Sequence, residues 1–149
     1  MRAVVQRVKE SSVRVNSEVA GETGAGLLVF LGIGKGDTEK DADYLLEKII
    51  NLRIFEDAEG KFIQSLLDLK GELMVIPQFT LYGDARKGRR PSFSEAAKGE
   101  RAEELYEYFI YRAKDLRIPV SQGRFGEHME VRLINDGPVT ILFDSGRLF

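Results

Sequence analysis

The stretch Asn135-Asp136-Gly137-Pro138-Val139-Thr140 lies near the C-terminus, between two runs in which apolar and polar residues alternate. Met129 to Leu133 forms the run before it, and Val139 to Phe143 forms the run after it. Such period-two alternation predicts two β-strands. Asp-Gly between strands favours a simple hairpin turn, whereas Gly-Pro removes a backbone donor and is a peptide bond that can be cis. The residues alone leave both interpretations open.

The composition predicts one domain spanning residues 1–149. The chain has 149 residues, of which 43% are hydrophobic, enough for a sizeable core. Charged residues make up 31%, but the net charge is only −2, so any contact with nucleic acid requires a local basic patch. No apolar run of membrane-spanning length occurs, and the N-terminus becomes polar too early for a signal peptide. We therefore expect a soluble, cytoplasmic protein without a membrane partner.

Cysteine is absent, which excludes disulfides, thiolate metal sites and a cysteine nucleophile. His128 is the single histidine, so a His-rich metal site is excluded and a Ser-His-Asp arrangement has one candidate base. Nothing in the sequence places His128 near a hydroxyl, and a lone histidine beside Met129 is typical of a surface or strand-end position. Conventional triad catalysis is weakly supported. The hydroxyl candidates are Thr80, Ser92 and Ser145.

Several strands are predicted in the first half of the chain. Residues 2–8 are apolar and β-branched, and Arg7 falls on the same phase as Ala3 and Val5, so it is either a strand-end surface residue or a buried fork that holds backbone carbonyls. The other expected elements are a hairpin over 13–20, a buried strand over 27–33, an amphipathic helix over 37–50 and a hairpin whose arms, 52–56 and 61–67, flank residues 57–60.

In the second half, the strand that starts at Leu73 runs into Pro77, which predicts an edge, a bulge or a break with free backbone donors after it. The loop over 83–91 contains four cations that suit either a solvated surface or phosphate contacts. Capping-box spacing predicts a helix from Ser92, and a strand is expected over 120–125. The fold class is α+β, with curved antiparallel or mixed, barrel-like β-sheets and two main helices packed on one side.

Six segments, in order along nearly the whole chain, resemble the D-aminoacyl-tRNA deacylase (D-tyrosyl-tRNA(Tyr) deacylase) family. They are Val5-Gln6-Arg7-Val8, residues 52–57, Gln78-Phe79-Thr80-Leu81-Tyr82, residues 87–93, Gly123-Arg124-Phe125-Gly126 and the opening stretch at 135–140. The resemblance implies a homodimeric hydrolase of that family's fold, without metal or other cofactor. Its substrate would be D-aminoacyl-tRNA, cleaved at the ester to the 3′-terminal adenosine in translation quality control.

The resemblance also assigns roles to residues. Gly137 and Pro138 form a cis pair that enters the partner subunit's active site and rejects L-amino acids by exclusion. Backbone N–H groups of the catalytic segment would serve as oxyanion donors. Thr80 is the family's candidate nucleophile, but no base flanks it in the sequence, so we favour attack by water assisted by the ribose 2′-hydroxyl. The catalytic segment is Gln78, Phe79 and Thr80; the substrate-binding residues are Gly137, Pro138, Arg7, Pro77, Phe125 and Met129; the tRNA phosphate contacts are Arg86, Lys87, Arg89 and Arg90.

Two positions depart from the family pattern. Pro77 replaces the usual serine, and Glu127 replaces a small residue. A related branch with looser chirality has proline at the first position, whereas Phe79 matches the D-specific branch. Two alternatives therefore stand beside chiral proofreading: a relaxed deacylase that removes glycine or alanine from mischarged tRNA, and a non-catalytic nucleic-acid-binding module.

Overall fold

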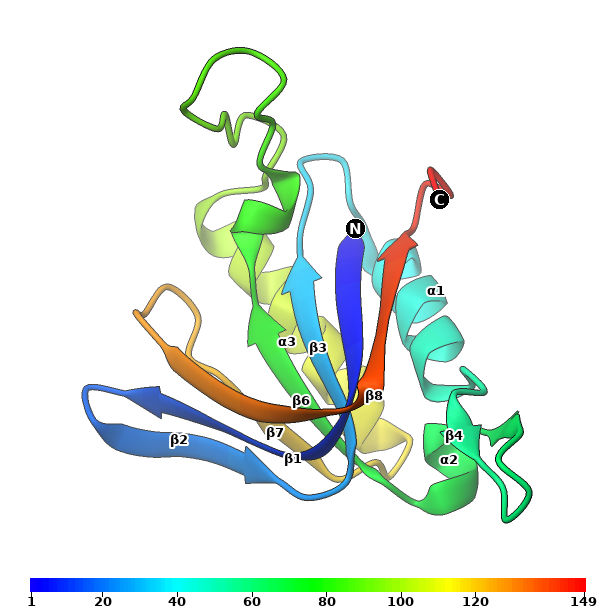
Figure 1. The fold of residues 1–149 in the computed structure, drawn as a ribbon. Helices are drawn as coiled ribbons and strands as arrows, with labels where there is room; N and C mark the ends of the chain where they lie inside the picture. The colour runs from blue at the N-terminus through cyan, green and yellow to red at the C-terminus, as the bar shows by residue number, and fades with distance from the viewer.

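The computed structural model describes residues 1–149, in which a curved mixed sheet carries two long helices on one face (Figure 1). A separate small hairpin and one short helix lie beside it. In chain order the elements are β1 (Arg2–Val15), β2 (Glu18–Thr23), β3 (Gly26–Gly32), α1 (Glu39–Ile50), β4 (Phe55–Glu56), β5 (Phe62–Gln64), α2 (Leu66–Leu69), β6 (Glu72–Pro77), the 3₁₀ helix η1 (Phe79–Tyr82), α3 (Gly99–Asp115), β7 (Val120–Gln122) and β8 (Glu130–Asp144).

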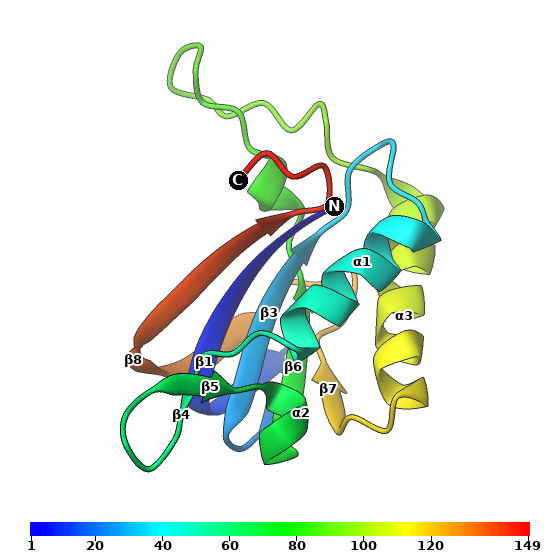
Figure 2. The same cartoon turned by 90° about the vertical axis from the view of Figure 1, so that its right-hand side faces the viewer.

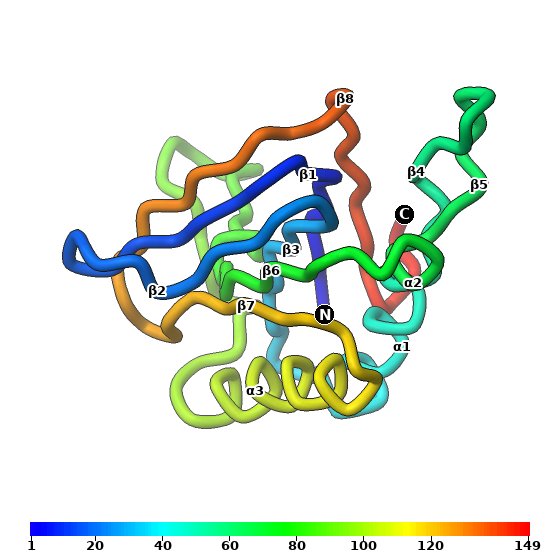
Figure 3. Tube along the Cα trace, turned by 90° about the horizontal axis from the view of Figure 1, so that it is seen from below, coloured from blue at the N-terminus to red at the C-terminus, as the bar shows by residue number.

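The strand β1 is the centre of the sheet. It pairs antiparallel with β3 and then β2 along one edge, and with β8 along the other. β3, β6 and β7 then follow in parallel. The sheet curls until β2 approaches β7, where the Ser121 hydroxyl donates to the Glu22 carbonyl at 2.7 Å (Figure 3). The predicted α+β class with a barrel-like mixed sheet is confirmed.

α1 and α3 cover one face of the sheet, as Figure 2 shows. One apolar stripe of α3 is buried and packs with α1 and the sheet into the main core; it consists of Ala102, Leu105, Tyr106, Phe109, Ile110 and Ala113. Asp43 of α1 joins the two helices, because it accepts hydrogen bonds from the Tyr108 hydroxyl and from Arg112 Nε at 3.0 Å. None of the helices is both long enough and apolar enough to span a membrane.

The hairpin interpretation of residues 135–140 is wrong, because β8 is one strand. Its two alternating runs do not pair with each other. Residues 140–144 lie opposite residues 2–6, and residues 130–135 lie opposite residues 8–14. Between these ladders, residues 136–139 bulge out opposite Arg7 alone. Alternation identifies strands but not their partners, and here the partner lies at the opposite end of the chain.

This bulge also changes which face of the sheet the side chains occupy. From Asn135 to Thr140 the chain advances five residues, while β1 advances two from Val8 to Gln6. Side chains alternate between the two faces of a sheet along each strand. Because five residues of β8 lie opposite two of β1, odd-numbered residues of β8 change from one face to the other across the bulge. Residues 139, 141 and 143 therefore pack against the core beneath the helices, whereas residues 129, 131 and 133 pack against a second, smaller core on the other face.

Three other boundaries differ from the predictions. No helix begins at Ser92, because its backbone forms two 2.8 Å hydrogen bonds with Asp84 and the following residues pair with the segment after β3; α3 begins at Gly99 instead. The arm over 61–67 ends early, since a capping box between Ser65 and Asp68 starts α2. The strand expected over 120–125 contains only residues 120–122.

Candidate functional site

A cavity of about 320 Å³ opens where β6 ends. Nine of its 14 lining residues are hydrophobic. Five of the predicted site residues line it, namely Pro77, Gln78, Phe79, Phe125 and Met129. Arg7, Thr80, Gly137, Pro138 and the basic loop are not among its lining residues.

The backbone after Pro77 leaves the sheet and turns into η1, so the break predicted at this proline is confirmed. The Gln78 N–H donates to the Leu31 carbonyl at 2.8 Å and continues the ladder for one residue. Gln78 therefore cannot be a backbone oxyanion donor, which corrects that part of its predicted role. The N–H groups of Phe79 and Thr80 have no partner in the fold, as is usual for the first residues of a helix.

The side chains of Gln78, Phe79 and Thr80 contact few other groups. Phe79 is 57% exposed and packs edge-on against Phe93, with ring centroids 5.1 Å apart. The Gln78 side-chain amide donates to the Thr80 hydroxyl. No histidine, lysine or carboxylate hydrogen-bonds to Thr80, so its hydroxyl has no base to activate it.

The opposite wall of the cavity is formed by the segment that comes after β7 in the chain. The Phe125 ring packs against Tyr106 of α3 at a centroid distance of 5.9 Å. Tyr106 is fully buried, and its hydroxyl donates to the Val75 carbonyl at 2.9 Å. Burial raises the pKa of the Tyr106 hydroxyl well above its usual value, so it remains a donor throughout the physiological range. The Phe125 ring, backed by the buried Tyr106 ring, therefore lines the same cavity as Phe79.

Two charged or polar residues of the lining were not predicted as site residues. Glu127 and His128 both line the cavity and are exposed. His128 is exposed, as predicted, but the sequence analysis did not predict that it lines the cavity. A turn brings Glu127 and His128 to the cavity, and in this turn the Glu127 N–H donates to the Arg124 carbonyl. The sequence signal for the turn was Gly126, between Phe125 and Glu127.

The bulge of β8 is held from beneath by Arg7, which is only 7% exposed. Arg7 Nε donates to the Asp136 carbonyl at 2.8 Å, and its Nη1 donates to the Ile54 carbonyl at 2.7 Å. The buried-fork interpretation of Arg7 is therefore confirmed. Asn135 closes the bulge, because its side-chain oxygen accepts the Val139 N–H at 2.9 Å.

Gly137 and Pro138 lie exposed at the tip of this bulge, and the peptide bond between them is cis. Gly137 has a φ of +142°, which favours glycine. A Cβ atom there would lie 2.8 Å from a Val139 methyl group and 3.3 Å from Arg7 Nη2. The backbone path at the tip therefore requires glycine.

The cavity and the bulge are far apart within one chain. Arg7 is opposite Leu27 on β3, whereas Pro77 is opposite Leu31, four residues further along the same strand. Three strand spacings also separate β8 from β6. With about 3.3 Å per residue and about 4.8 Å per strand, the separation is roughly 20 Å.

The loop after η1 carries the four predicted phosphate contacts, all exposed. Arg86 is already paired, because its Nη2 lies 2.7 Å from an Asp84 carboxylate oxygen. Hydrogen bonds from the Arg86 side chain and backbone lower the pKa of Asp84 to about 2, so this pair persists at neutral pH. Lys87, Arg89 and Arg90 have no ion-pair partner. No cluster of three or more potential metal-ligating side chains occurs.

Comparison with known proteins finds similar chains over nearly the whole sequence. Residues 4–144 match the family described as D-Tyr-tRNA(Tyr) deacylase. D-aminoacyl-tRNA deacylases of Thermosipho melanesiensis and Clostridium tetani are 56% and 58% identical to this chain, each over the full length of both proteins.

Solved structures with the same fold also match. The c-Myc DNA Unwinding Element Binding Protein superposes with a TM-score of 0.91 at 40% identity, covering 97% of this chain and 98% of that one. A probable eukaryotic D-amino acid tRNA deacylase superposes with a TM-score of 0.82 at 20% identity, covering 95% and 97%, which shows likeness of fold alone.

Proposed function

Because the chain belongs to the D-Tyr-tRNA(Tyr) deacylase family of hydrolases, we propose that it removes D-amino acids from mischarged tRNA and spares L-aminoacyl-tRNA. In this proposal, residues 1–149 act as one catalytic domain in the cytoplasm. The observation that carries it is the pair of unpartnered N–H groups of Phe79 and Thr80 beside an apolar cavity. Such donors suit the oxyanion of ester hydrolysis.

The cavity would receive the 3′-terminal adenosine, with its base between the walls that Phe125, Met129 and Phe79 provide. The ester carbonyl oxygen would then accept the two N–H groups. A water oxygen attacks the carbonyl carbon, while the ribose 2′-hydroxyl accepts a proton from the water and gives its own to the departing 3′ oxygen. The products are a free D-amino acid and a tRNA with an intact 3′-hydroxyl, so the protein supplies geometry and backbone donors rather than a side-chain base.

Chirality would be read by the exposed Gly137-Pro138 tip of a second copy. The roughly 20 Å between tip and cavity within one chain supports this arrangement, since the tip cannot reach its own cavity. In a homodimer, backbone carbonyls of the tip would lie near the substrate α-carbon. An L side chain would clash with them, whereas a D side chain would point to solvent.

The basic loop would hold the tRNA backbone through Lys87, Arg89 and Arg90. We expect Arg89→Ala to weaken binding of D-tyrosyl-tRNA and glycyl-tRNA equally, and to reduce the slope of log K against log salt by about one. Asp84→Asn should have the opposite effect, steepening the slope by about one, because it releases Arg86 from its ion pair. Titrations at several salt concentrations measure both slopes, and a change in D/L discrimination in Arg89→Ala would contradict this role.

Two other functions have specific support. Pro77 at the cavity motivates the relaxed deacylase that acts on glycyl or alanyl esters. A binding module without turnover is favoured by the exposed cations and by the name of the relative at 40% identity, which describes a DNA-binding protein.

The deciding experiment is deacylation of matched D-tyrosyl-, L-tyrosyl- and glycyl-tRNA in the presence of a chelator. Loss of the D ester alone is the expected result. Loss of the L or glycyl ester as well would support the relaxed deacylase. Salt-dependent tRNA binding with no cleavage of any ester would support the binding module.

A further inference from the structure

We propose that Arg2 is a positioning residue, which fixes η1 and thereby the Phe79 and Thr80 N–H groups in their catalytic orientation. This inference rests on the proposed function, because it assigns a role within the same site. Arg2 does not line the cavity and touches none of the groups that would contact the ester. Its effect would pass through the backbone of η1.

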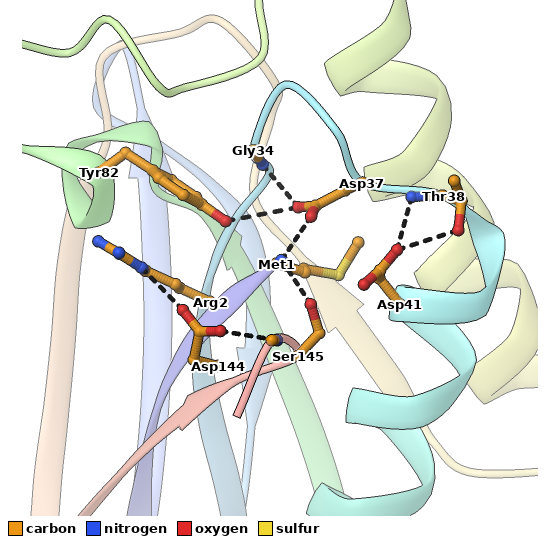
Figure 4. A network of polar contacts seen from close by, with 10 residues as sticks. Met1, Arg2, Gly34, Asp37, Thr38, Asp41, Tyr82, Asp144 and Ser145 are labelled. Carbon is orange, nitrogen blue, oxygen red and sulfur yellow. Dashed lines mark hydrogen bonds and ion pairs between the residues drawn. The ribbon is translucent and has the colours of Figure 1, made fainter. Parts of the chain in front are cut away.

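Three contacts of Arg2 converge on this region. Figure 4 shows two of the partners, Asp144 and Tyr82. Its Nη1 donates to the Leu81 carbonyl at 3.1 Å, one residue after Thr80. Its Nε donates to Asp144 Oδ2, also at 3.1 Å, and the Asp144 side chain is only 7% exposed. The guanidinium carbon also lies 4.6 Å from the centre of the Tyr82 ring. One side chain therefore ties η1 to the ends of β1 and β8.

Tyr82 is held from its other side as well. Its hydroxyl lies 3.5 Å from Asp37 Oδ2, which also accepts the Gly34 N–H at 2.6 Å. A Cβ atom on Gly34 would lie 2.6 Å from the Tyr82 hydroxyl oxygen, so this glycine leaves room for the ring. Burial, with Asp37 nearby, raises the pKa of Tyr82, which keeps the hydroxyl protonated as a donor to Asp37. The ring is thus clamped between Arg2 and the Gly34–Asp37 turn.

η1 needs such support because it has little of its own. It contains four residues, none of them buried. The backbone hydrogen bonds at its two ends are Leu81 N–H to Gln78 O at 3.3 Å and Gly83 N–H to Thr80 O at 2.9 Å. Short 3₁₀ segments have poor hydrogen-bond geometry, so their conformation depends on tertiary contacts. Arg2 and Tyr82 supply these contacts at the C-terminal end of η1.

Arg112 offers a matched control. Its Nε–carboxylate distance is 3.0 Å, against 3.1 Å for Arg2, and its side chain is 35% exposed, against 31%. Arg112 joins α1 and α3 and makes no contact with η1. Arg2→Met and Arg112→Met therefore remove similar ion pairs, only one of which supports η1.

The test measures kcat and KM for D-tyrosyl-tRNA, together with hydrogen exchange of the Leu81 and Gly83 amides. We expect Arg2→Met to lower kcat by about tenfold to 100-fold with little change in KM, since misplacement by about 1 Å has effects of this size. Exchange at both amides should rise, while Arg112→Met leaves kcat and exchange unchanged. Arg2→Lys should recover part of kcat, because lysine can donate to Leu81 or Asp144 but cannot reproduce the planar fork.

The exchange measurement separates the two proposals. If Arg2→Met leaves exchange at Leu81 and Gly83 unchanged, the positioning role is overturned, whatever the activity. Equal losses of kcat in Arg2→Met and Arg112→Met would also overturn it, because both losses would then reflect lower stability of the fold rather than the position of η1. If the wild type cleaves no ester but Arg2→Met still raises exchange, the proposed function fails, while the hold of Arg2 on η1 stands.

Discussion

Arg7→Met is expected to lower kcat/KM for D-tyrosyl-tRNA by about 100-fold or more and to reduce the melting temperature. The guanidinium of Arg7 is the donor to both the Asp136 and the Ile54 carbonyls. Hydrogen bonds to charged groups contribute about 1.5–3 kcal/mol each, and methionine offers no replacement donor. The tip that carries Gly137 and Pro138 would lose its anchor to β1, and the proposed chirality filter would lose its fixed position.

Arg14→Met is the control for this prediction, because Arg14 lies on the same strand but is exposed and has no ion-pair partner. It should leave both activity and melting temperature nearly unchanged. Steady-state kinetics with D- and L-tyrosyl-tRNA, alongside thermal unfolding, measure the effects. A variant Arg7→Met with full activity and an unchanged D/L ratio would show that the tip does not depend on this fork.

The sequence was sufficient to predict the elements of β8 but not their arrangement. The alternating runs on either side of residues 135–140 are both strands, yet their common partner is β1 at the other end of the chain. A hairpin and a bulged single strand have the same local alternation, and only long-range pairing distinguishes them. The residues alone likewise left two interpretations of Arg7, because burial depends on the β4–β5 hairpin that packs nearby.

The cavity was predictable in part. The break at Pro77 follows from the chemistry of proline, and it correctly located backbone donors after β6. The Gln78 amide was wrongly included, because the parallel ladder to Leu31 continues for one residue beyond the proline. Glu127 and His128 were missed, since their position depends on a turn between β7 and β8 whose geometry is not encoded in any periodic pattern.

Phe79→Pro should reduce kcat by about 100-fold relative to Phe79→Ala, because loss of one oxyanion donor costs about this much. Both variants lose the ring that packs on Phe93, but only proline removes the N–H. Proline is tolerated at the first position of a helix, and Gln78, with φ −145° and ψ 80°, already lies outside the α region that a following proline disfavours. Single-turnover rates at saturating enzyme compare the two, with melting temperatures to verify equal folding.

Thr80→Ala distinguishes this chemistry from attack by the Thr80 hydroxyl. Alanine keeps the Thr80 N–H and removes only the hydroxyl, which accepts from the Gln78 side chain and has no base beside it. We therefore expect Thr80→Ala to retain kcat within about threefold, against the factor of about 100 for the lost Phe79 donor. If Thr80→Ala instead abolished turnover while substrate binding and fold persisted, and Phe79→Pro matched Phe79→Ala, the hydroxyl rather than the backbone would carry the reaction.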